Sequence, residues 1–135
     1  TNGEIKEIRA SDVNLEDRVV RLPGNARVDE RINELSDWGV MVLRERFAYI
    51  DGDDFVVVNS NGSQASEASV SQMFRLIASY GNVGRNGFNI NSVRAWRARA
   101  IYMESGRIQD AALFLGNRSL DASVALMGLE WRQSA

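Results

Sequence analysis

The sequence predicts a mainly helical α+β fold with a small antiparallel β-sheet. Short β-branched segments on either side of a turn fill the first part of the chain. Segments with apolar residues at helical spacing fill most of the rest. A length of 135 residues suits one domain with a single core, so we expect one domain over residues 1–135.

The first part of the chain is expected to form a hairpin after a short helix. Residues 4–8 have apolar side chains three apart, as if a helix were entered midway, which predicts that the chain is a fragment of a longer protein. Residues 12–17, which include Asp12, Asn14, Glu16 and Asp17, predict a turn. The β-branched residues 18–22 predict a strand. The Pro-Gly turn at 23–26 then leads to an expected returning strand at 27–33.

Two helices and a short strand are expected next. Ser36 is a good N-cap for a helix whose apolar positions continue to Ile50. The short segment 55–58 is rich in β-branched residues, which predicts a strand. Residues 66–80 predict a second helix, and the glycine- and asparagine-rich residues 81–87 a link.

A third helix is expected to be the central one. Asn91 or Ser92 is the predicted N-cap. Two short helices should follow at 108–115 and 120–128, separated by residues 116–119. The central position is predicted because the third helix is apolar on two sides, with one stripe of Val93, Trp96, Ala100 and Met103 and an opposite set of Ala98, Ile101 and Tyr102.

The composition excludes several kinds of chemistry. The chain has no cysteine and no histidine, which removes thiolate and imidazole metal ligands and histidine acid–base catalysis. We expect no metal and no cofactor, and Asp51, Asp53 and Asp54 lack the ligand spacing of a calcium loop. No apolar run of membrane-spanning length and no signal peptide are visible, so we expect a cytoplasmic protein without a membrane partner.

Charge is unevenly distributed along the chain. The net charge of −2 argues against a strongly basic nucleic-acid binder. Residues 1–80, however, carry nine basic and fourteen acidic side chains, whereas residues 81–118 carry six basic and two acidic ones. The basic segment predicts a face suited to phosphate. A solvated helix face is the alternative.

Five segments, taken in chain order, resemble the catalytic domain of the tyrosine recombinases, the phage-integrase family. Residues 3–14 are similar to the family's opening S-E-L-L-A-L-R-W-S-D-V-D, and residues 15–24 to its strand L-E-N-R-T-I-x-V-P-G. Residues 30–36 resemble E-R-V-V-P-L-S. Residues 106–109 and 115–120 resemble G-x-x-I-Q-x-L-L-G-H-S-S-L. The resemblance covers almost the whole chain and implies an integrase-like catalytic-domain fold.

The resemblance also places the family's catalytic groups on this sequence. Members cut DNA by attack of a tyrosine on a phosphodiester, with cations and donors that stabilise the transition state. Thr1 stands where the family has its first arginine. Ala26 stands at its lysine, with Arg27 adjacent. The H-x-x-R motif matches asparagine at position 91 and Arg94, although a register counted back from position 106 would put Ala95 at the arginine.

The remaining catalytic positions are also changed. Asn117 replaces the histidine of L-G-H, and the nucleophile position falls on Leu126 or Met127. Loss of one preorganised donor costs about 10²–10³ in rate, and loss of a phosphate-stabilising arginine about 10³–10⁵. We therefore expect no catalytic residue and no activity. All the tyrosines stand upstream: Tyr49, Tyr80 and Tyr102.

Four arginines are the candidate DNA-binding residues, namely Arg94, Arg97, Arg118 and Arg27. Arg94 and Arg97 are neighbours on the third helix, away from its apolar stripe. The alternatives are that Arg97 pairs with Glu104 and that Arg118 is an ordinary exposed loop arginine. The tryptophans, Trp38, Trp96 and Trp131, are interpreted as core or interface packing rather than base-stacking platforms.

Three functions remain open at this point. The first is an inactive DNA-binding protein of the integrase family, with double-stranded DNA as its partner and homo-oligomers on that DNA. The second is an active integrase whose missing groups come from another subunit or a missing segment. The third is a protein-interaction module that uses the acidic residues 1–80.

Overall fold

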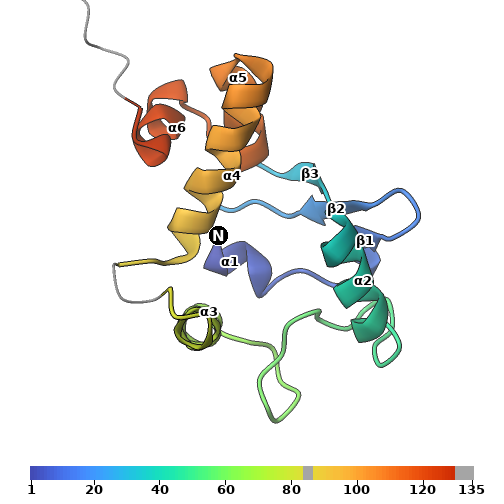
Figure 1. Cartoon of the computed structure of the whole chain (residues 1–135). Helices are drawn as coiled ribbons and strands as arrows, with labels where there is room; N and C mark the ends of the chain where they lie inside the picture. The colour runs from blue at the N-terminus through green and yellow to red at the C-terminus, as the bar shows by residue number, and fades with distance from the viewer. Residues whose placement is uncertain (84–86, 130–135) are drawn as a thin grey trace, which may run out of the picture. The chain divides into compact units, whose positions relative to one another are not determined.

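The computed structural model describes residues 1–83 and 87–129 and has a mainly helical α+β fold (Figure 1). It contains a three-stranded antiparallel sheet, so the predicted fold class is confirmed. None of the helices in these two ranges is long and apolar enough to cross a membrane. The elements are α1 (Asn2–Ile5), a 3₁₀ turn (Ala10–Asp12), β1 (Val13–Asn14), β2 (Val19–Leu22), β3 (Arg31–Glu34), α2 (Asp37–Arg46), α3 (Glu67–Tyr80), α4 (Ile90–Ser105), α5 (Ile108–Leu115) and α6 (Leu120–Met127).

The chain divides into two compact units. Unit 1 comprises Thr1–Asn25 and Glu30–Gln72, and unit 2 comprises Ala26–Asp29 and Met73–Ala135. Helix α3 therefore contributes its first residues to unit 1 and its later residues to unit 2. The expectation of one domain over the whole chain stays a prediction.

The sheet lies in unit 1 and has the order β1-β2-β3. β2 and β3 form the predicted hairpin, with Val20 opposite Asn33. The returning strand begins at Arg31 rather than at residue 27. The reason is that residues 26–29 make their backbone contacts within unit 2, where the amide of Asp29 donates to the carbonyl of Gly116 at 2.8 Å.

Two predictions for unit 1 were wrong. Residues 13–14, expected in a turn, form β1 and pair with β2, so the turn occupies only residues 15–18. Residues 55–58, expected as a strand, form isolated bridges, from Phe55 to Arg9 and from Val58 to Gln64. In both places a tertiary partner decided the outcome over local β propensity.

The predicted helices at 36–50 and 66–80 are confirmed. The hydroxyl of Ser36 accepts from the amide of Gly39 at 3.1 Å and caps α2, as expected. This helix ends at Arg46, a turn earlier than predicted. α3 runs over Glu67–Tyr80, within one residue of its expected start.

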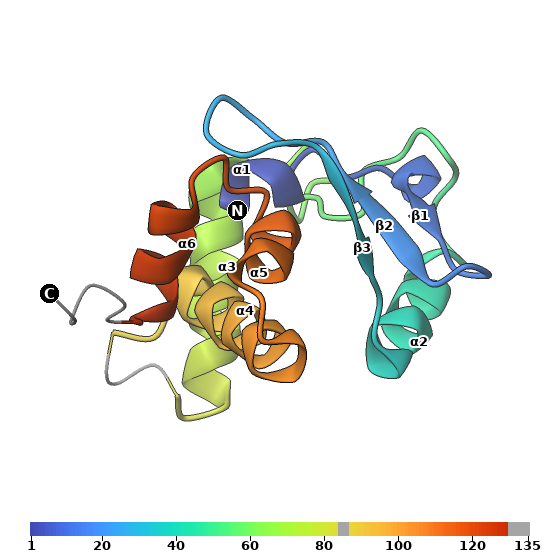
Figure 2. The same cartoon turned by 90° about the horizontal axis from the view of Figure 1, so that it is seen from above.

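Helices α4, α5 and α6 form the core of unit 2, and they lie side by side in Figures 1 and 2. α5 has its predicted bounds and α6 ends one residue early. Small residues allow the helices to approach closely, because Ala98 of α4 and Ala111 of α5 are both fully buried. The core cluster is Ala98, Ala111, Leu115 and Met127, covered by Tyr102, Phe114, Leu126 and Leu129.

Of the two apolar sides expected on α4, only the one with Ala98 faces the core. Ala98 is buried, but Trp96 and Met103 of the expected apolar stripe are 70% and 75% exposed. The N-cap is Asn89, two residues before the predicted one. Trp38 is also exposed, so neither of these tryptophans is a core residue. Trp131 lies outside the described residues.

Candidate nucleic-acid interface

All four candidate DNA-binding arginines lie in unit 2. Arg94 and Arg97 are on α4, and Arg118 is in the loop between α5 and α6. Arg27 is in the short segment Ala26–Asp29 that belongs to the same unit. The chain thus brings residues more than 90 positions apart into one compact body.

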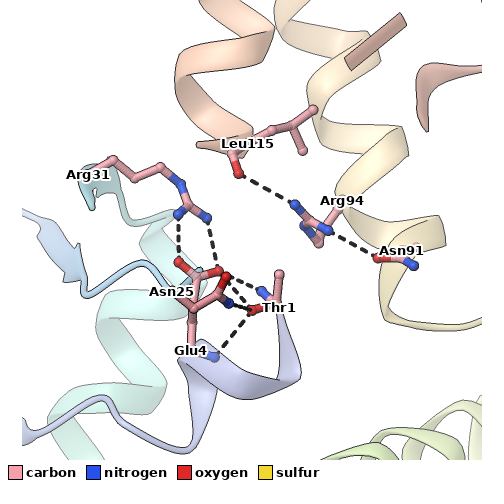
Figure 3. Close-up of polar contacts among 7 residues, drawn as sticks. All are labelled: Thr1, Glu4, Asn25, Arg31, Asn91, Arg94 and Leu115. Atoms are coloured by element: carbon pink, nitrogen blue, oxygen red, sulfur yellow. Dashed lines mark hydrogen bonds and ion pairs between the residues drawn. The ribbon is translucent and has the colours of Figure 1, made fainter. Parts of the chain in front are cut away.

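Arg94 is held at two points of unit 2 (Figure 3). Its Nη1 donates to Oδ1 of Asn91 at 3.1 Å, one turn earlier on α4. Its Nη2 donates to the carbonyl of Leu115 at 3.4 Å, a long hydrogen bond at the end of α5. The side chain is half-buried. These contacts orient the guanidinium beside the loop that carries Arg118.

Arg97 follows one turn later on the same helix. Its side chain is exposed and forms no hydrogen bond or ion pair with any residue that the structure describes. The alternative pairing with Glu104 is therefore not formed between these two described residues. The guanidinium of Arg97 is open to solvent and able to take an anionic partner.

Arg118 is paired with a carboxylate. Its Nε donates to Oδ1 of Asp29 at 2.7 Å, and its Nη1 lies 3.5 Å from the carbonyl of Ala26. About 60% of each partner's side chain is open to solvent, since the two values are 61% and 56%. The sequence offered an ordinary exposed loop arginine as the alternative for Arg118 and gave no sign of its ion pair with Asp29.

Arg27 is exposed on a segment that is anchored by its neighbour. Val28 is 5% exposed and bridges to Asn117 in an antiparallel pair. The buried Val28 fixes the backbone of residues 26–29 against the α5–α6 loop. Arg27 and Arg118 are therefore carried by two backbone segments that touch.

The two units differ in charge. Among the described residues, unit 2 carries seven arginines against four carboxylates, a balance of +3. Unit 1 carries seven basic against thirteen acidic side chains, a balance of −6. Arg85, part of the basic segment in the sequence, lies outside the described residues. The uneven charge found along the sequence thus follows the division into units.

Solved structures share this architecture, whereas no family model and no curated protein matches the sequence. The XerA recombinase crystal structure matches with a TM-score of 0.76 and 17% identity over 96% of this chain and 48% of that one. The XerH site-specific recombinase was solved in a post-cleavage complex with palindromic difH substrate. It matches with a TM-score of 0.72 and 19% sequence identity over 95% of this chain and 38% of that one. The Tn1549 transposon integrase, in complex with transposon right end DNA, matches with a TM-score of 0.64 and 14% sequence identity over 93% of this chain and 49% of that one.

This is the fold of a tyrosine recombinase catalytic domain. The predicted resemblance is confirmed at the level of the fold. The chain spans about half, or less, of the length of the recombinases that it matches.

Thr1, which the sequence resemblance aligns with the family's first arginine, is the N-cap of α1. The hydroxyl of Thr1 donates to Oε2 of Glu4 at 3.1 Å and accepts from the amide of Glu4 at 3.2 Å (Figure 3). Arg31 of β3 holds the same carboxylate, with Nη1 2.6 Å from Oε1 and Nη2 3.3 Å from Oε2. Glu4 is 1% exposed, so this is a buried ion pair within unit 1.

The Glu4 carboxylate is strongly held in its charged form. Burial raises the pKa of Glu4, but hydrogen bonds from Arg31 and the amino terminus outweigh that effect and lower the pKa to about 2. Glu4 lies within residues 3–14, which resemble the family's opening segment, but the sequence did not reveal its partner. The two residues are 27 positions apart, and only the folded structure shows that they meet.

The residues that the sequence resemblance aligns with the second histidine and the nucleophile, namely Asn117 and Leu126 or Met127, contact other residues of unit 2. Asn117 donates through Nδ2 to the hydroxyl of Ser123 at 3.1 Å, and Ser123 is fully buried. Met127 belongs to the core cluster, and Leu126 packs against it. Tyr102 also packs against this cluster. The side chains at positions 126 and 127 thus contribute apolar contacts rather than a hydroxyl.

The acidic side chains of the described residues are spread out rather than grouped. Among residues 1–83 and 87–129, no three histidine, cysteine or acidic side chains are grouped closely enough to hold a metal ion. Asp54 instead accepts from the amide of Asp51 at 2.8 Å, as in an ordinary turn.

Proposed function

We propose that this chain is a non-catalytic protein that binds double-stranded DNA through unit 2. The observation that carries the proposal is that Arg27, Arg94, Arg97 and Arg118 all belong to unit 2, which is the positively charged unit of a recombinase fold. Arginine side chains are suited to phosphate because their planar forks match its oxygens. Two of the similar structures were solved with DNA, which agrees with this function.

The same proposal assigns no cutting activity to the chain. A tyrosine recombinase needs a hydroxyl nucleophile close to cationic donors. No tyrosine follows Tyr102 in the sequence, and the expected position falls on packed apolar side chains of α6. Thr1 and Asn117, which stand at two further catalytic positions, hydrogen-bond to Glu4 and Ser123. Without a hydroxyl nucleophile at this position no covalent intermediate can form, so cleavage by this chain is expected to be undetectable.

Direct binding measurements test the DNA-binding part. A labelled mixed-sequence duplex of about 30 base pairs at about 50 mM salt favours phosphate contacts. We expect binding by the intact chain and at least tenfold weaker binding by the double variant Arg94→Ala with Arg97→Ala. Arg44→Ala is the matched control, because Arg44 is an exposed helical arginine of the acidic unit 1. Absence of binding at this salt would refute the proposal.

Covalent trapping tests the missing catalysis. A nicked suicide duplex captures the phosphotyrosine intermediate of an active recombinase because the cut end diffuses away. We expect no covalent protein–DNA adduct, either alone or with added copies of the chain. An adduct that maps to Tyr49, Tyr80 or Tyr102 would instead favour an active integrase whose groups come together in another way.

A protein-interaction role is the second candidate, and one observation favours it. Unit 1 exposes several large apolar side chains on and beside α2, which is unusual for a surface that contacts only water: Ile32, Trp38, Met41 and Tyr49. Indifference to DNA together with binding of a protein partner that Trp38→Ala abolishes would support this function over the first.

A further inference from the structure

The carboxylate of Asp29 is paired with the guanidinium of Arg118, one of the groups proposed to bind a DNA phosphate. Its Oδ1 lies 2.7 Å from Nε of Arg118, the geometry of a strong charge-assisted hydrogen bond. Arg118 also approaches the carbonyl of Ala26 at 3.5 Å. The acceptors on Arg118 are thus supplied by the segment that also carries Arg27, another candidate for DNA contact.

The backbone holds Asp29 in this place independently of its carboxylate. The amide of Asp29 donates to the carbonyl of Gly116 at 2.8 Å, two residues before Arg118. The adjacent Val28 is buried and bridges to Asn117. These contacts keep the carboxylate beside the loop whether or not Arg118 stays paired with it.

We infer that Asp29 is an internal competitor that occupies Arg118 in place of a DNA phosphate and so lowers the affinity of unit 2 for DNA. The inference rests on the proposed function, since it assigns a regulator to the same arginine site. A carboxylate and a phosphodiester each offer two oxygens and one negative charge to the guanidinium. Arg118 is half-exposed, so a phosphate reaches it from solvent once the carboxylate is released.

The pair can be exchanged at little cost to the fold. Both side chains are more than half exposed, and ion pairs of this kind contribute little to stability. Asp29 also repels an approaching phosphate after Arg118 has turned away. Removal of the carboxylate therefore frees one cation and removes one nearby negative charge.

The experiment compares Asp29→Asn with a control of equal charge change. Asp110→Asn removes a carboxylate from the same unit, where Asp110 lies 3.8 Å from the Nε of Arg107 on a different surface pair. With the same duplex at about 50 mM salt, Asp29→Asn is expected to tighten binding about three- to tenfold and to steepen the salt dependence by about one phosphate contact. Asp110→Asn is expected to change binding less than twofold.

The background variant Arg118→Gln shows whether the effect passes through Arg118. Asp29→Asn should give no more than a twofold gain when Arg118 is already glutamine. Asp29→Ser serves as a second variant, and unchanged urea denaturation shows that each protein is folded. Equal gains from Asp29→Asn and Asp110→Asn, or a full gain without Arg118, would overturn the inference while DNA binding itself stands. Failure of every folded variant to bind overturns both.

Discussion

At the scale of single residues, the buried carboxylate of Glu4 is the side chain whose loss should cost the most stability. It is 1% exposed and shares both oxygens with Arg31, which is itself only 11% exposed. Glu4→Gln removes the carboxylate that accepts from both Nη1 and Nη2 of Arg31, in a place that water hardly reaches. We expect the free energy of unfolding to fall by about 3 kcal/mol, as measured by urea denaturation followed by circular dichroism.

An exposed pair in the same unit is the control for this change. Glu30 accepts from Nε of Arg21 at 2.9 Å, and both side chains are more than half exposed. Glu30→Gln is expected to cost less than about 1 kcal/mol, because water solvates both partners after the pair is lost. Equal losses from Glu4→Gln and Glu30→Gln would show that burial does not determine the strength of the Glu4 pair.

The lowered pKa of Glu4 predicts a particular dependence of stability on pH. Folding lowers this pKa from its ordinary value of 4.5 to about 2. Above pH 4.5 the carboxylate is charged in both states, and its stabilisation is complete. As the pH falls from about 4.5 to 2, the unfolded chain takes up the proton first, so stability is lost. The difference in unfolding free energy between the intact chain and Glu4→Gln should therefore shrink over this range.

At the scale of elements, the start of α4 makes a test of capping. Oδ1 of Asn89 accepts from the amide of Asn91 at 2.9 Å, and the amide of Asn89 donates to the hydroxyl of Ser92 at 3.1 Å. Asn89→Ala removes the first contact and is expected to lower the free energy of unfolding by about 1 kcal/mol. Asn91→Ala, at the cap that the sequence suggested, should lower the free energy of unfolding by less than half as much, as measured by urea denaturation. A larger loss from Asn91→Ala than from Asn89→Ala would place the cap at position 91.

Asn91 has a different role, so its variant should separate stability from binding. Its side chain accepts from Nη1 of Arg94 at 3.1 Å and orients that guanidinium. Asn91→Ala is expected to weaken binding to the duplex about two- to fivefold at about 50 mM salt, with little change in unfolding. A loss of stability without a loss of binding would contradict this role.

The helices could be predicted from the sequence because their signals are local. Ser36, the apolar spacing of residues 66–80 and the glycines after α5 and α6 each act within one or two turns. β1 could not be predicted, since two residues carry too little pattern and only their pairing with β2 defines them. The same limit explains residues 55–58, where β propensity was present but a continuous partner strand was not.

The sequence also could not show which of the two apolar sides of α4 is buried. Both sides were expected to be covered, but the side with Trp96 and Met103 is exposed. The core of unit 2 instead accepts the small Ala98, because helices packed at close distance leave no room for large side chains. The sequence predicted that Arg94 and Arg97 lie on the third helix and Arg118 in a loop after it, whereas it placed Arg27 in a strand that begins only at Arg31. The position of Asp29 was not predictable, because it meets Arg118 only through a contact 89 residues distant in sequence.

At the scale of the whole molecule, the net charge of −2 is the sum of contributions of opposite sign from the two units. Unit 2 is positive and unit 1 strongly negative over the described residues. An acidic unit in the same chain reduces long-range attraction to DNA but cannot prevent short-range contacts to individual arginines, because salt screens charges beyond about 10 Å. The total charge of a small protein is therefore a poor guide to nucleic-acid binding when the charge follows its compact parts.

The salt dependence of binding measures how many arginines of unit 2 reach phosphates. Each phosphate that a cation neutralises releases counterions and adds about −0.9 to the slope of log K against log salt. Contacts from Arg27, Arg94, Arg97 and Arg118 together predict a slope between about −3 and −4. Arg94→Ala with Arg97→Ala should bring the slope about two units closer to zero. Arg44→Ala in unit 1 should leave it unchanged. Fluorescence anisotropy from about 25 to 200 mM salt measures all three. A slope that Arg44→Ala reduces as much as a unit 2 variant would mean that DNA responds to the overall charge rather than to this group of arginines.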